Sequence, residues 1–550
     1  MPRLIVLLSG PVGSGKTTLC TRLKEAYSSV LHVKTGEYLK KKFPAKDAER
    51  RALQEAGETL DRRNRGAWVR DCVSDALRDP DIPDEIVVIV DAVRISGQVD
   101  AMREAYGRKV IHVHLTAPRE VLERRYRRRK PHGIKELASY GEVIQNFTEA
   151  KVEDLKAIAD VVIDTKRSTP EDVETRVAAA TGFYGRNDER LVDVLIGGQY
   201  GSEGKGQIAA FLAPEYDLLV RVGGPNAGHS VHEFGGKYVY HHLPSGTRAS
   251  SARLLLAPGC VIGVSTLLKE IADCNADRGR LVIDRQAMVI SPDDIRSEQS
   301  LVASIGSTGQ GVGAATARKI RDRMPGKTKL AKDIPELAPF VGEAWRTLEK
   351  VFAERKTVLL EGTQGTALSL HHGYYPHVTS RDTTVAGCLA EAGISPSRVR
   401  RVIMVCRTYP IRVQSPKDST SGPMLQETKW REVSRRSGLP YRELVQHEVT
   451  STTHRSRRVA EFDWLLLRKA ASLNAPTDVA LTFADYLSSA NRQAQRFDQL
   501  SAETIRFVEE VERVAGAPVS LISTRFHSLG IIDRRSWGGQ LRQTNVSGLR

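Results

Sequence analysis

The 550-residue sequence predicts an α/β fold arranged in two large domains. Two segments far apart in the chain repeat one order of elements: an apolar strand, a glycine-rich turn and a helix. The first has its strand at 4–8 and its turn at 10–15, and the second has its strand at 192–196 and its turn at 197–206. Short β-branched runs elsewhere alternate with helical patterns, as in α/β proteins with buried parallel strands.

The first domain is predicted over residues 1–182. Its further strands are expected at 86–90, 110–115 and 161–163, and residues 146–159 carry apolar positions at helical spacing. The polar, turn-rich residues 183–190 are predicted to be a linker.

The second domain is predicted over residues 191–533, followed by a polar, frayed tail at 534–550. Five further buried strands are expected there, at 218–222, 358–360, 402–405, 479–481 and 519–522. The whole chain therefore predicts a parallel-sheet domain with a phosphate loop, followed by an α/β domain with a large central sheet.

The charge balance points to anionic partners. Lysine and arginine number 82 against 66 acidic residues, so the net charge is +16. Nucleic acid and phosphorylated small molecules both fit a basic chain. The basic runs lack the interleaved aromatic residues of a single-strand binding groove, so we expect phosphorylated small molecules and no nucleic acid.

The cysteines and apolar runs indicate a cytoplasmic protein. None of the six cysteines forms a CxxC pair, so the spacing indicates neither a zinc site nor a disulfide framework. The apolar run at 4–8 leads directly into a glycine motif and lacks a signal-peptide cleavage site. The apolar runs are shorter than the ~18 residues of a membrane helix, so no membrane partner is expected.

Residues 10–17, GPVGSGKT, match the complete phosphate-loop pattern GxxxxGK[ST]. The glycines let backbone N–H groups turn towards phosphate oxygens, Lys16 brings positive charge, and the Thr17 hydroxyl can hold Mg²⁺. The residues expected to bind nucleotide are Gly10, Gly13, Gly15, Lys16, Thr17 and Thr18. Asp91 ends a predicted strand, and two interpretations of it stay open. In one, it contacts Mg²⁺ or orients a phosphate acceptor; in the other, it is a plain turn residue at the end of the strand.

An arginine-rich segment, RRYRRRK at 124–130, follows the predicted strand 110–115. Phosphoryl transfer needs cations over the transferring group, and a lid of arginines can supply them; a solvated basic helix face is the alternative. With the phosphate loop and the segment TGE at 35–37, residues 1–182 resemble a nucleoside or deoxynucleoside monophosphate kinase. The acceptor is left open.

The second glycine loop, GGQYGSEGKG at 197–206, also forms a phosphate cradle at a helix start. Further motifs follow it in order, at 222–230, 241–246, 306–311, 361–366 and 375–380. Together these segments resemble the adenylosuccinate synthetase family over about residues 191–530. The resemblance implies an α/β fold around a large central sheet and a homodimer.

That family phosphorylates the 6-oxo group of a purine nucleotide from a nucleoside triphosphate with Mg²⁺, and the amine of aspartate then displaces the phosphate. The resemblance implies that His229 is the general acid, Lys205 the phosphate-loop lysine, and Gln364 the contact to the 6-oxygen, where charge develops. The residues implied for the phosphate donor are Gly201, Glu203, Gly204, Lys205, Gly206, Gly228, His229, Ser230 and Asp485. The residues implied for the purine monophosphate are Ser202, Asn226, Thr308, Gln364, Thr379 and Arg321.

The family also uses an arginine of the neighbouring subunit on the nucleotide phosphate, and the resemblance leaves Arg321 or Arg323 as alternatives for it. The residues implied for aspartate are Thr452, Thr453, Arg455 and Arg457, and the two arginines suit bidentate carboxylate binding. The metal ligands implied are Gly228 and Ser202 here and Thr17 in the first domain.

Ser202 departs from the family, which has an aspartate there that takes the purine N1 proton and helps to hold Mg²⁺. Serine is a poor base, and losing a general base costs about 10²–10⁴-fold. The viral 2-aminoadenylosuccinate synthetases, which act on dGMP, resemble this sequence and also lack that aspartate. A serine leaves room beside the guanine 2-amino group, so dGMP is the expected acceptor, although a carboxylate can also pair with the guanine N1–H and N2–H edge.

The donor segments depart as well. The family reads GTP with a TKLD-type segment and a later STG, where this sequence has TFAD at 482–485 and STR at 523–525. Asp485 is retained, but Phe483 and Arg525 replace the lysine and the glycine. ATP or dATP is therefore the expected phosphate donor, with GTP as the alternative.

These observations predict a bifunctional enzyme of purine biosynthesis. A C–N ligase would join L-aspartate to C6 of dGMP with hydrolysis of ATP or dATP, giving 2-amino-2'-deoxy-N6-succinyladenylate for 2-aminoadenine nucleotides, and it would be fused to a nucleotide kinase. One alternative is adenylosuccinate synthesis from IMP with GTP, with Glu203 as the nearest replacement base. The other is a catalytically dead nucleotide sensor, against which the retained Lys16, Thr17, Lys205 and His229 argue.

Overall fold

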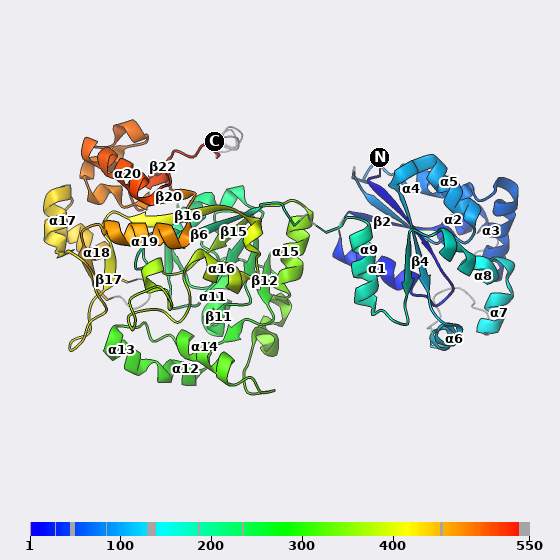
Figure 1. Ribbon diagram of the computed structural model, residues 1–550, viewed down its shortest axis with the longest axis horizontal. Helices are drawn as coiled ribbons and strands as arrows, with labels where there is room; N and C mark the ends of the chain where they lie inside the picture. Colours follow the sequence, from blue (N-terminus) through cyan, green and yellow to red (C-terminus); the bar gives the residue numbers. More distant parts are fainter. Residues whose placement is uncertain are drawn as a thin grey trace. The chain divides into compact units, whose positions relative to one another are not determined.

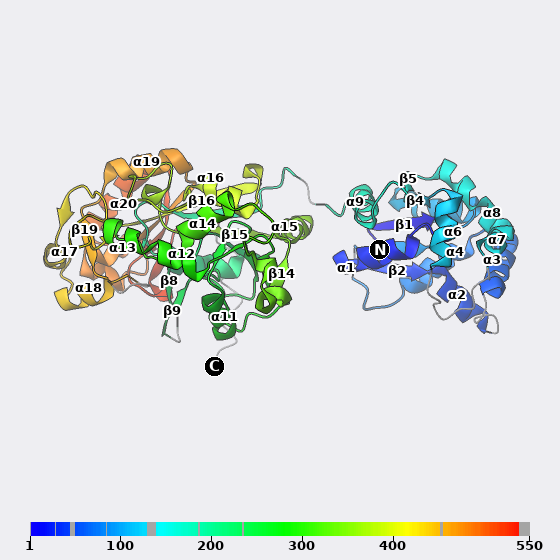
Figure 2. The same cartoon turned by 90° about the horizontal axis from the view of Figure 1, so that it is seen from below.

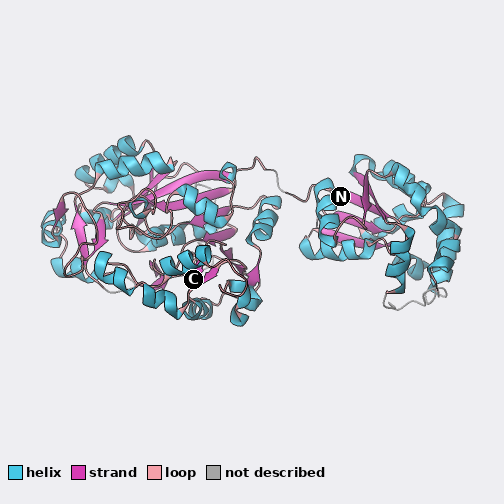
Figure 3. Cartoon of the chain, turned by 60° about the horizontal axis from the view of Figure 1, so that its bottom comes forward, coloured by secondary structure: helices cyan, strands magenta, loops and turns pink. Residues whose placement is uncertain are grey.

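The computed structural model describes residues 2–27, 29–44, 50–83, 85–128, 139–184, 187–233, 236–450 and 455–537. Contacts divide the chain into two units, residues 1–184 and 185–550, each with its own sheet and core (Figures 1 and 3). Within the described ranges, no helix is long and apolar enough to cross a membrane.

The first unit is a five-stranded parallel sheet in the order β2-β3-β1-β4-β5. Its strands are β1 (Leu4–Ser9), β2 (Val30–Lys34), β3 (Val87–Asp91), β4 (Val110–Thr116) and β5 (Val161–Asp164). Its helices are α1 (Lys16–Ala26), α2 (Thr35–Lys42), α3 (Arg50–Asn64), α4 (Trp68–Ala76), α5 (Ser96–Tyr106), α6 (Arg119–Arg127), α7 (Tyr140–Gln145), α8 (Phe147–Lys151) and α9 (Pro170–Ala180).

Strand β1 lies at the centre and is covered on both faces. Ile5 and Leu7 belong to one hydrophobic cluster, whereas Val6 and Leu8 belong to another. This two-sided burial explains why the strand is an uninterrupted apolar run. The helix expected at 146–159 is instead the short α8 followed by a 3₁₀ segment, Val152–Ile158.

The second unit contains a ten-stranded sheet in the order β14-β12-β10-β7-β15-β6-β16-β20-β21-β22. Every pairing is parallel except β21 with β22, so the sheet is mixed. Its strands are β6 (Val192–Gly197), β7 (Leu218–Arg221), β10 (Arg253–Leu256), β12 (Leu281–Asp284), β14 (Val341–Gly342), β15 (Val358–Glu361), β16 (Val399–Arg407), β20 (Asp478–Thr482), β21 (Val519–Ser523) and β22 (Ile531–Asp533).

Helices cover this sheet, and α12, α13 and α14 form a group beside it (Figures 1 and 2). The helices are α10 (Lys205–Leu212), α11 (Val264–Asp273), α12 (Pro292–Ser297), α13 (Gln299–Ile305), α14 (Val312–Arg321), α15 (Ala344–Ala353), α16 (Val385–Ala392), α17 (Trp430–Ser437), α18 (Tyr441–His447), α19 (Trp464–Asn474) and α20 (Ala502–Ala515). Smaller sheets join β8 (His229–Glu233) to β9 (Gly236–Tyr240), β11 (Val261–Ile262) to β13 (Met288–Val289), and β19 (Arg457–Ala460) to both β17 (Ile411–Val413) and β18 (Glu427–Thr428).

Strand β6 sits where the strand order reverses, because its neighbours are β15 on one side and β16 on the other. In open α/β sheets, ligands bind beyond the carboxyl ends of the strands at such a point. Strand β1 holds the same position between β3 and β4 in the first unit. Both glycine loops follow these two strands, so the topology puts each at the expected binding edge.

The prediction of a frayed tail over 534–550 is wrong for residues 534–537, which pack against the domain. Arg535 is 9% exposed, and its guanidinium pairs with Glu215 at 2.7 Å and Asp533 at 2.8 Å. The guanidinium of Arg401 lies 4.1 Å from the ring centre of Trp537. These contacts extend the packed domain to at least residue 537, and residues 538–550 lie outside the described part.

Candidate active site

A cavity of about 860 Å³ opens at the carboxyl edge of the large sheet in the second unit. Its walls come from the loops after several strands: Lys205 after β6, Gln364 after β15, Phe483 after β20 and Arg525 after β21. It therefore gathers motifs that are more than 300 residues apart in the sequence.

The second glycine loop forms one wall. Gly204, in the left-handed conformation at φ 88°, precedes α10, and Lys205 begins the helix. The cavity is lined by Gly201, Ser202, Gly204, Lys205, Gly206, Gly228, His229 and Ser230. The expected donor-binding backbone and lysine are thus brought together.

Glu203 is the exception in this loop. Its carboxylate is fully buried, accepts hydrogen bonds from the backbone N–H of Gln199 at 3.1 Å and of Gly201 at 2.7 Å, and pairs with Lys205 Nζ at 2.6 Å. The side chain therefore braces the loop from inside and does not line the cavity. The alternative in which Glu203 replaces the missing base is wrong for this arrangement.

His229 is held by a buried carboxylate. Its Nδ1 lies 2.6 Å from Glu361 Oε1, and Arg221 Nη1 lies 2.6 Å from the same oxygen. Burial and the Arg221 charge lower the pKa of His229 to about 3. Burial alone would raise the pKa of Glu361, but Arg221 and His229 lower it to about 2. Arg221 Nη1 also lies 2.7 Å from His229 Nδ1. The ionised Glu361 can accept a proton carried on Nδ1, and that tautomer leaves Nε2 for a ligand.

Gln364 and Asn226 form the next wall. Gln364 has a left-handed backbone with φ 58°, and its Nε2 donates to Asn226 Oδ1 at 3.2 Å. Thr308 and Thr379 line the same cavity. Arg321 does not line it; the side chain is 73% exposed at the end of α14 and pairs with Asp322.

Ser202 faces the cavity from a left-handed backbone, φ 56°. Its Oγ accepts a long hydrogen bond, 3.4 Å, from Arg457 Nη2. Glu448 is buried and accepts from Arg457 Nη1 at 2.9 Å, from Arg407 Nη2 at 2.6 Å and from the Tyr486 hydroxyl at 2.7 Å. Burial raises the pKa of Glu448, but the two arginines outweigh it and lower the pKa to about 2.

This network presents Arg457 beside Ser202, where a carboxylate ligand could bind it. Arg455 does not line the cavity, and Thr452 and Thr453 lie outside the described residues.

The far end of the cavity is aromatic. The rings of Phe483 and Phe526 are nearly parallel, at 13°, with centroids 6.3 Å apart. Asp485 lies close by, and its Oδ2 accepts from Arg492 Nε at 3.1 Å. Burial raises the pKa of Asp485 to about 6, against the opposing charge of Arg492. The Phe483 ring offers a stacking face, and Asp485 and Arg525 line the same cavity with hydrogen-bonding groups, a combination that can bind a nucleobase.

Several lining or supporting residues were missed from the sequence. Glu361 opens the quoted segment 361–366 at a strand end, which was a usable signal. Arg221, Arg412 and Glu448 carried no such signal. Arg412 lines the cavity and is 6% exposed, and its Nη1 has no hydrogen-bond partner among the described residues.

The oxygen donors expected for Mg²⁺ fit that ion in chemical type. The Gly228 carbonyl region and the Ser202 hydroxyl face one cavity, and oxygen is the ligand that Mg²⁺ prefers.

The phosphate loop of the first unit follows β1. A Cβ at Gly10 would lie 2.0 Å from the Leu115 carbonyl oxygen, so only glycine fits. Gly15 caps α1 with φ 100°, and Lys16 Nζ donates to the carbonyls of Gly10 at 2.6 Å and Pro11 at 3.0 Å. Thr17 and Thr18 are exposed on the first turn of α1, so the Thr17 hydroxyl is open to Mg²⁺.

The arginine-rich segment partly reaches this loop. Arg125 Nη1 donates to the Gly13 carbonyl at 3.3 Å, and its Nη2 donates to the Thr165 carbonyl at 2.8 Å. Arg129 and Lys130 lie outside the described residues. Arg125 is therefore already placed over the phosphate loop.

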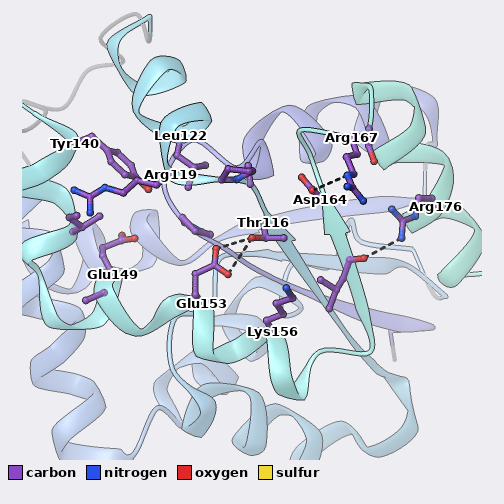
Figure 4. A pocket seen from close by; sticks show the side chains of 17 residues that line it. Thr116, Arg119, Leu122, Tyr140, Glu149, Glu153, Lys156, Asp164, Arg167 and Arg176 are labelled. Carbon is purple, nitrogen blue, oxygen red and sulfur yellow. Dashed lines mark hydrogen bonds and ion pairs between the residues drawn. The ribbon is translucent and has the colours of Figure 1, made fainter.

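The first unit has a cavity of about 880 Å³ that borders the phosphate loop at Pro11. Figure 4 shows Arg119, Lys156 and Arg176 around it, with Thr116 bonded to Glu153. Its mixture of cations and carboxylates, next to the loop, can accommodate a charged ligand.

Comparisons with known proteins identify relatives of both parts of the chain. The sequence profile of the adenylosuccinate synthetase family matches residues 194–332 and 325–492, and an AAA-domain profile matches residues 6–150. An adenylosuccinate synthetase of Pyrococcus sp. is 38% identical over 351 residues, which are 62% of this chain and 98% of that protein.

Two solved structures resemble the second part of the chain. One is cyanophage S-2L succinoaminodeoxyadenylate synthetase, bound to dGMP and to dATP as an energy donor, which is 28% identical with a TM-score of 0.54. The match covers 63% of this chain and 96% of the cyanophage chain. Fully ligated Plasmodium falciparum adenylosuccinate synthetase, 21% identical with a TM-score of 0.54, covers 63% of this chain and 100% of its own, and shares the fold.

Proposed function

The chain belongs to the adenylosuccinate synthetase family of C–N ligases, and from that premise we propose that its second unit joins L-aspartate to C6 of dGMP with hydrolysis of ATP or dATP. The observation that carries the choice of dGMP is Ser202. The residue faces the cavity beside Arg457, where the family has an aspartate.

The proposed chemistry follows the walls of the cavity. The glycine loop and Lys205 hold the triphosphate, and Mg²⁺ held by Gly228 and Ser202 would supply charge neutralisation. His229 transfers a proton at Nε2, because Glu361 holds its Nδ1. The anionic triphosphate raises the pKa of His229 above its value in the empty site, which prepares it as an acid. Gln364 donates to the 6-oxygen, and Arg457 binds an aspartate carboxylate.

Ser202 supports a 2-amino purine through its hydrogen-bonding capacity. A hydroxyl can accept from an amine and donate to another group, so Ser202 Oγ can accept from the guanine 2-amino group. Carboxylates elsewhere in the described wall are already engaged: Glu298 accepts from three backbone N–H groups, Glu448 from two arginines, and Glu443 and Asp485 from Arg492. None of these four replaces the family aspartate at Ser202.

The donor end supports a stacked purine. Phe483 and Phe526 are nearly parallel, with ring centroids 6.3 Å apart, and need to open by at least about 0.7 Å to hold a base between them, since two stacking distances sum to about 7 Å. Asp485 Oδ1 is buried and has no hydrogen-bond partner among the described residues, so it can accept from the 6-amino group of adenine. Phe483, in place of the family lysine, removes one polar contact to guanine.

Adenylosuccinate synthesis from IMP with GTP is the second candidate. The Pyrococcus relative is more similar in sequence than the cyanophage enzyme and carries that family's ordinary name. Asp485 also suits the N1–H and N2–H donors of guanine. In either case, we propose a homodimer in which the exposed Arg321 reaches the acceptor phosphate of the neighbouring copy.

The test is a matrix of substrates. Purified protein with aspartate and Mg²⁺ receives dGMP, GMP or IMP, each with ATP, dATP or GTP, and the succinylated product is quantified by chromatography. We expect product from dGMP with ATP or dATP, with kcat/KM at least about 10-fold above IMP. Product from IMP but not dGMP contradicts the proposal, and no product with any purine favours a nucleotide sensor.

The substitution Ser202→Asp tests the acceptor directly. We expect it to restore the family carboxylate and to shift the ratio of kcat/KM for IMP over dGMP upward by at least about 10-fold, within the range of a general base. Ser202→Ala is the matched control, because it removes the hydroxyl without adding a charge. An unchanged ratio in Ser202→Asp would show that this position does not select the acceptor.

We further propose that the first unit phosphorylates a purine nucleoside monophosphate, such as the 2-aminoadenine deoxynucleotide formed after fumarate removal. The support is the phosphate loop with Lys16 and Thr17, and Arg125 placed over Gly13. The two units would then act in one route of nucleotide synthesis.

A further inference from the structure

Three side chains of the first unit with metal-binding atoms meet beside the phosphate loop. They are Cys20 on α1, His32 on β2 and Asp91 at the end of β3, and their ligand atoms all lie within 4.8 Å of one another. Cys20 is buried, and the other two are half-buried. Asp91 pairs in register with Leu8 of β1, two residues before Gly10.

The distances are close to those of a metal site. In a tetrahedral zinc site, metal–sulfur bonds of about 2.3 Å and metal–nitrogen or metal–oxygen bonds of about 2.0–2.2 Å put neighbouring ligand atoms about 3.3–3.6 Å apart. His32 Nε2 lies 3.5 Å from Asp91 Oδ2, within that range. The Cys20 sulfur lies within 4.8 Å of both of these atoms, so a shift of at most about 1.5 Å would bring the thiol into the same range.

His32 Nε2 is buried, and its contact to Asp91 Oδ2 at 3.5 Å is too long for a good hydrogen bond. A buried ring nitrogen with such a poor partner is costly. A metal ion placed between this nitrogen and Asp91 would satisfy both groups at once.

We propose that Cys20, His32 and Asp91 bind a zinc-type divalent ion, with water in the fourth position. The chemistry distinguishes this ion from the Mg²⁺ of phosphoryl transfer, because Mg²⁺ takes oxygen ligands whereas thiolate and imidazole select zinc-type metals. Burial raises the pKa of the Cys20 thiol, so the ion must displace its proton on binding. The cysteine spacing did not indicate this site, because its three ligands come from three separate elements.

Occupancy has a consequence for the first unit. Asp91 lies at the carboxyl end of β3, next to the strand that carries the phosphate loop. When the zinc-type ion holds its carboxylate, Asp91 no longer serves Mg²⁺ or a phosphate acceptor. Zinc therefore inhibits phosphoryl transfer by this unit; this consequence rests on the proposed kinase function, whereas binding itself does not.

The test titrates Co²⁺ into the full, untagged chain after a chelator has removed bound metal. We expect one equivalent to produce a thiolate-to-cobalt charge-transfer band and the visible bands of a tetrahedral ion, and Zn²⁺ to displace it. Cys20→Ser abolishes the charge-transfer band and weakens Zn²⁺ binding by at least about 100-fold, since losing a ligand costs more than losing an outer contact. Cys72→Ser is the matched control, because Cys72 is also buried in this unit but lies on α4.

Absence of the charge-transfer band in the native chain, or its persistence in Cys20→Ser, overturns the site. If Cys20→Ser loses cooperative thermal unfolding, His32→Asn decides, and an unchanged Zn²⁺ affinity there also overturns it. If Zn²⁺ binds and phosphotransfer is not reduced, the proposed inhibition is contradicted and the proposed metal site is not. A metal-free chain without any phosphotransfer counts against the kinase function and not against the site.

Discussion

His229→Ala is expected to lower the kcat/KM of the aspartate ligase by about 10²–10⁴-fold, the range for loss of a general acid. His229 lines the cavity beside the second glycine loop, and Glu361 lies 2.6 Å from its Nδ1. Alanine removes Nε2, the atom expected to transfer the proton, and leaves the phosphate loop in place. Initial rates with saturating aspartate, and the binding of triphosphate measured by calorimetry, separate loss of chemistry from loss of binding.

Two further variants sharpen this expectation. His371→Ala is the matched control, because His371 is exposed and does not line the cavity. Glu361→Gln keeps the size of the positioning residue and removes its charge, which supports the protonated form of His229. Removing a group that raises a histidine pKa lowers it, so activity in Glu361→Gln should fall at a lower pH than in the native chain as pH rises. A reduced rate with an unshifted pH profile would contradict a role of Glu361 in setting the pKa of His229.

The two phosphate loops could be predicted from local sequence, because the backbone geometry of each loop requires glycine at particular positions. Gly10 tolerates no Cβ, and Gly204 is left-handed immediately before a helix. The central strand β1 was predictable because a strand buried on both faces is a continuous apolar run. Strand β6 shares this character except at Asp193, which is buried and pairs with Arg400. Strands β10, β12 and β14 were missed. Strand β14 spans only two residues, too few for a period to be seen. Strand β10 reads RLLL, and such a short apolar run without β-branched residues does not distinguish a strand from a helix.

The direction of a side chain was harder to predict than its presence in a motif. Glu203 stands between two lining residues, Ser202 and Gly204, yet its carboxylate points into the loop and pairs with Lys205. Glu448 is distant from Arg407 in sequence, and only the tertiary fold brings them within 2.6 Å. Arg321 does not line the large cavity described for the second unit. Such placements depend on tertiary packing, which the spacing of residues does not encode.

Lys16→Ala is expected to reduce phosphotransfer by the first unit at least about 10³-fold, an estimate from the need to offset charge on the transferring phosphate, and to leave aspartate ligation within about 2-fold of the native rate. Lys16 belongs to the loop after β1, whereas Lys205 occupies the corresponding place after β6 in a separate unit. Two loops on two sheets should therefore fail independently. Coupled assays for nucleoside diphosphate and for succinylated product, run on one preparation, measure both activities.

The matched control is Lys24→Ala, because Lys24 is an exposed lysine on the same helix as Lys16. It should change neither activity.

The reciprocal variant, Lys205→Ala, should abolish ligation and spare phosphotransfer, although it also leaves the buried Glu203 without its partner. For that reason its thermal unfolding must be compared with the native chain, since an unpaired buried carboxylate destabilises a fold by about 3–5 kcal/mol. Joint loss of both activities in Lys16→Ala, with an intact fold, would contradict two separate nucleotide sites and would require the first loop to serve the ligase.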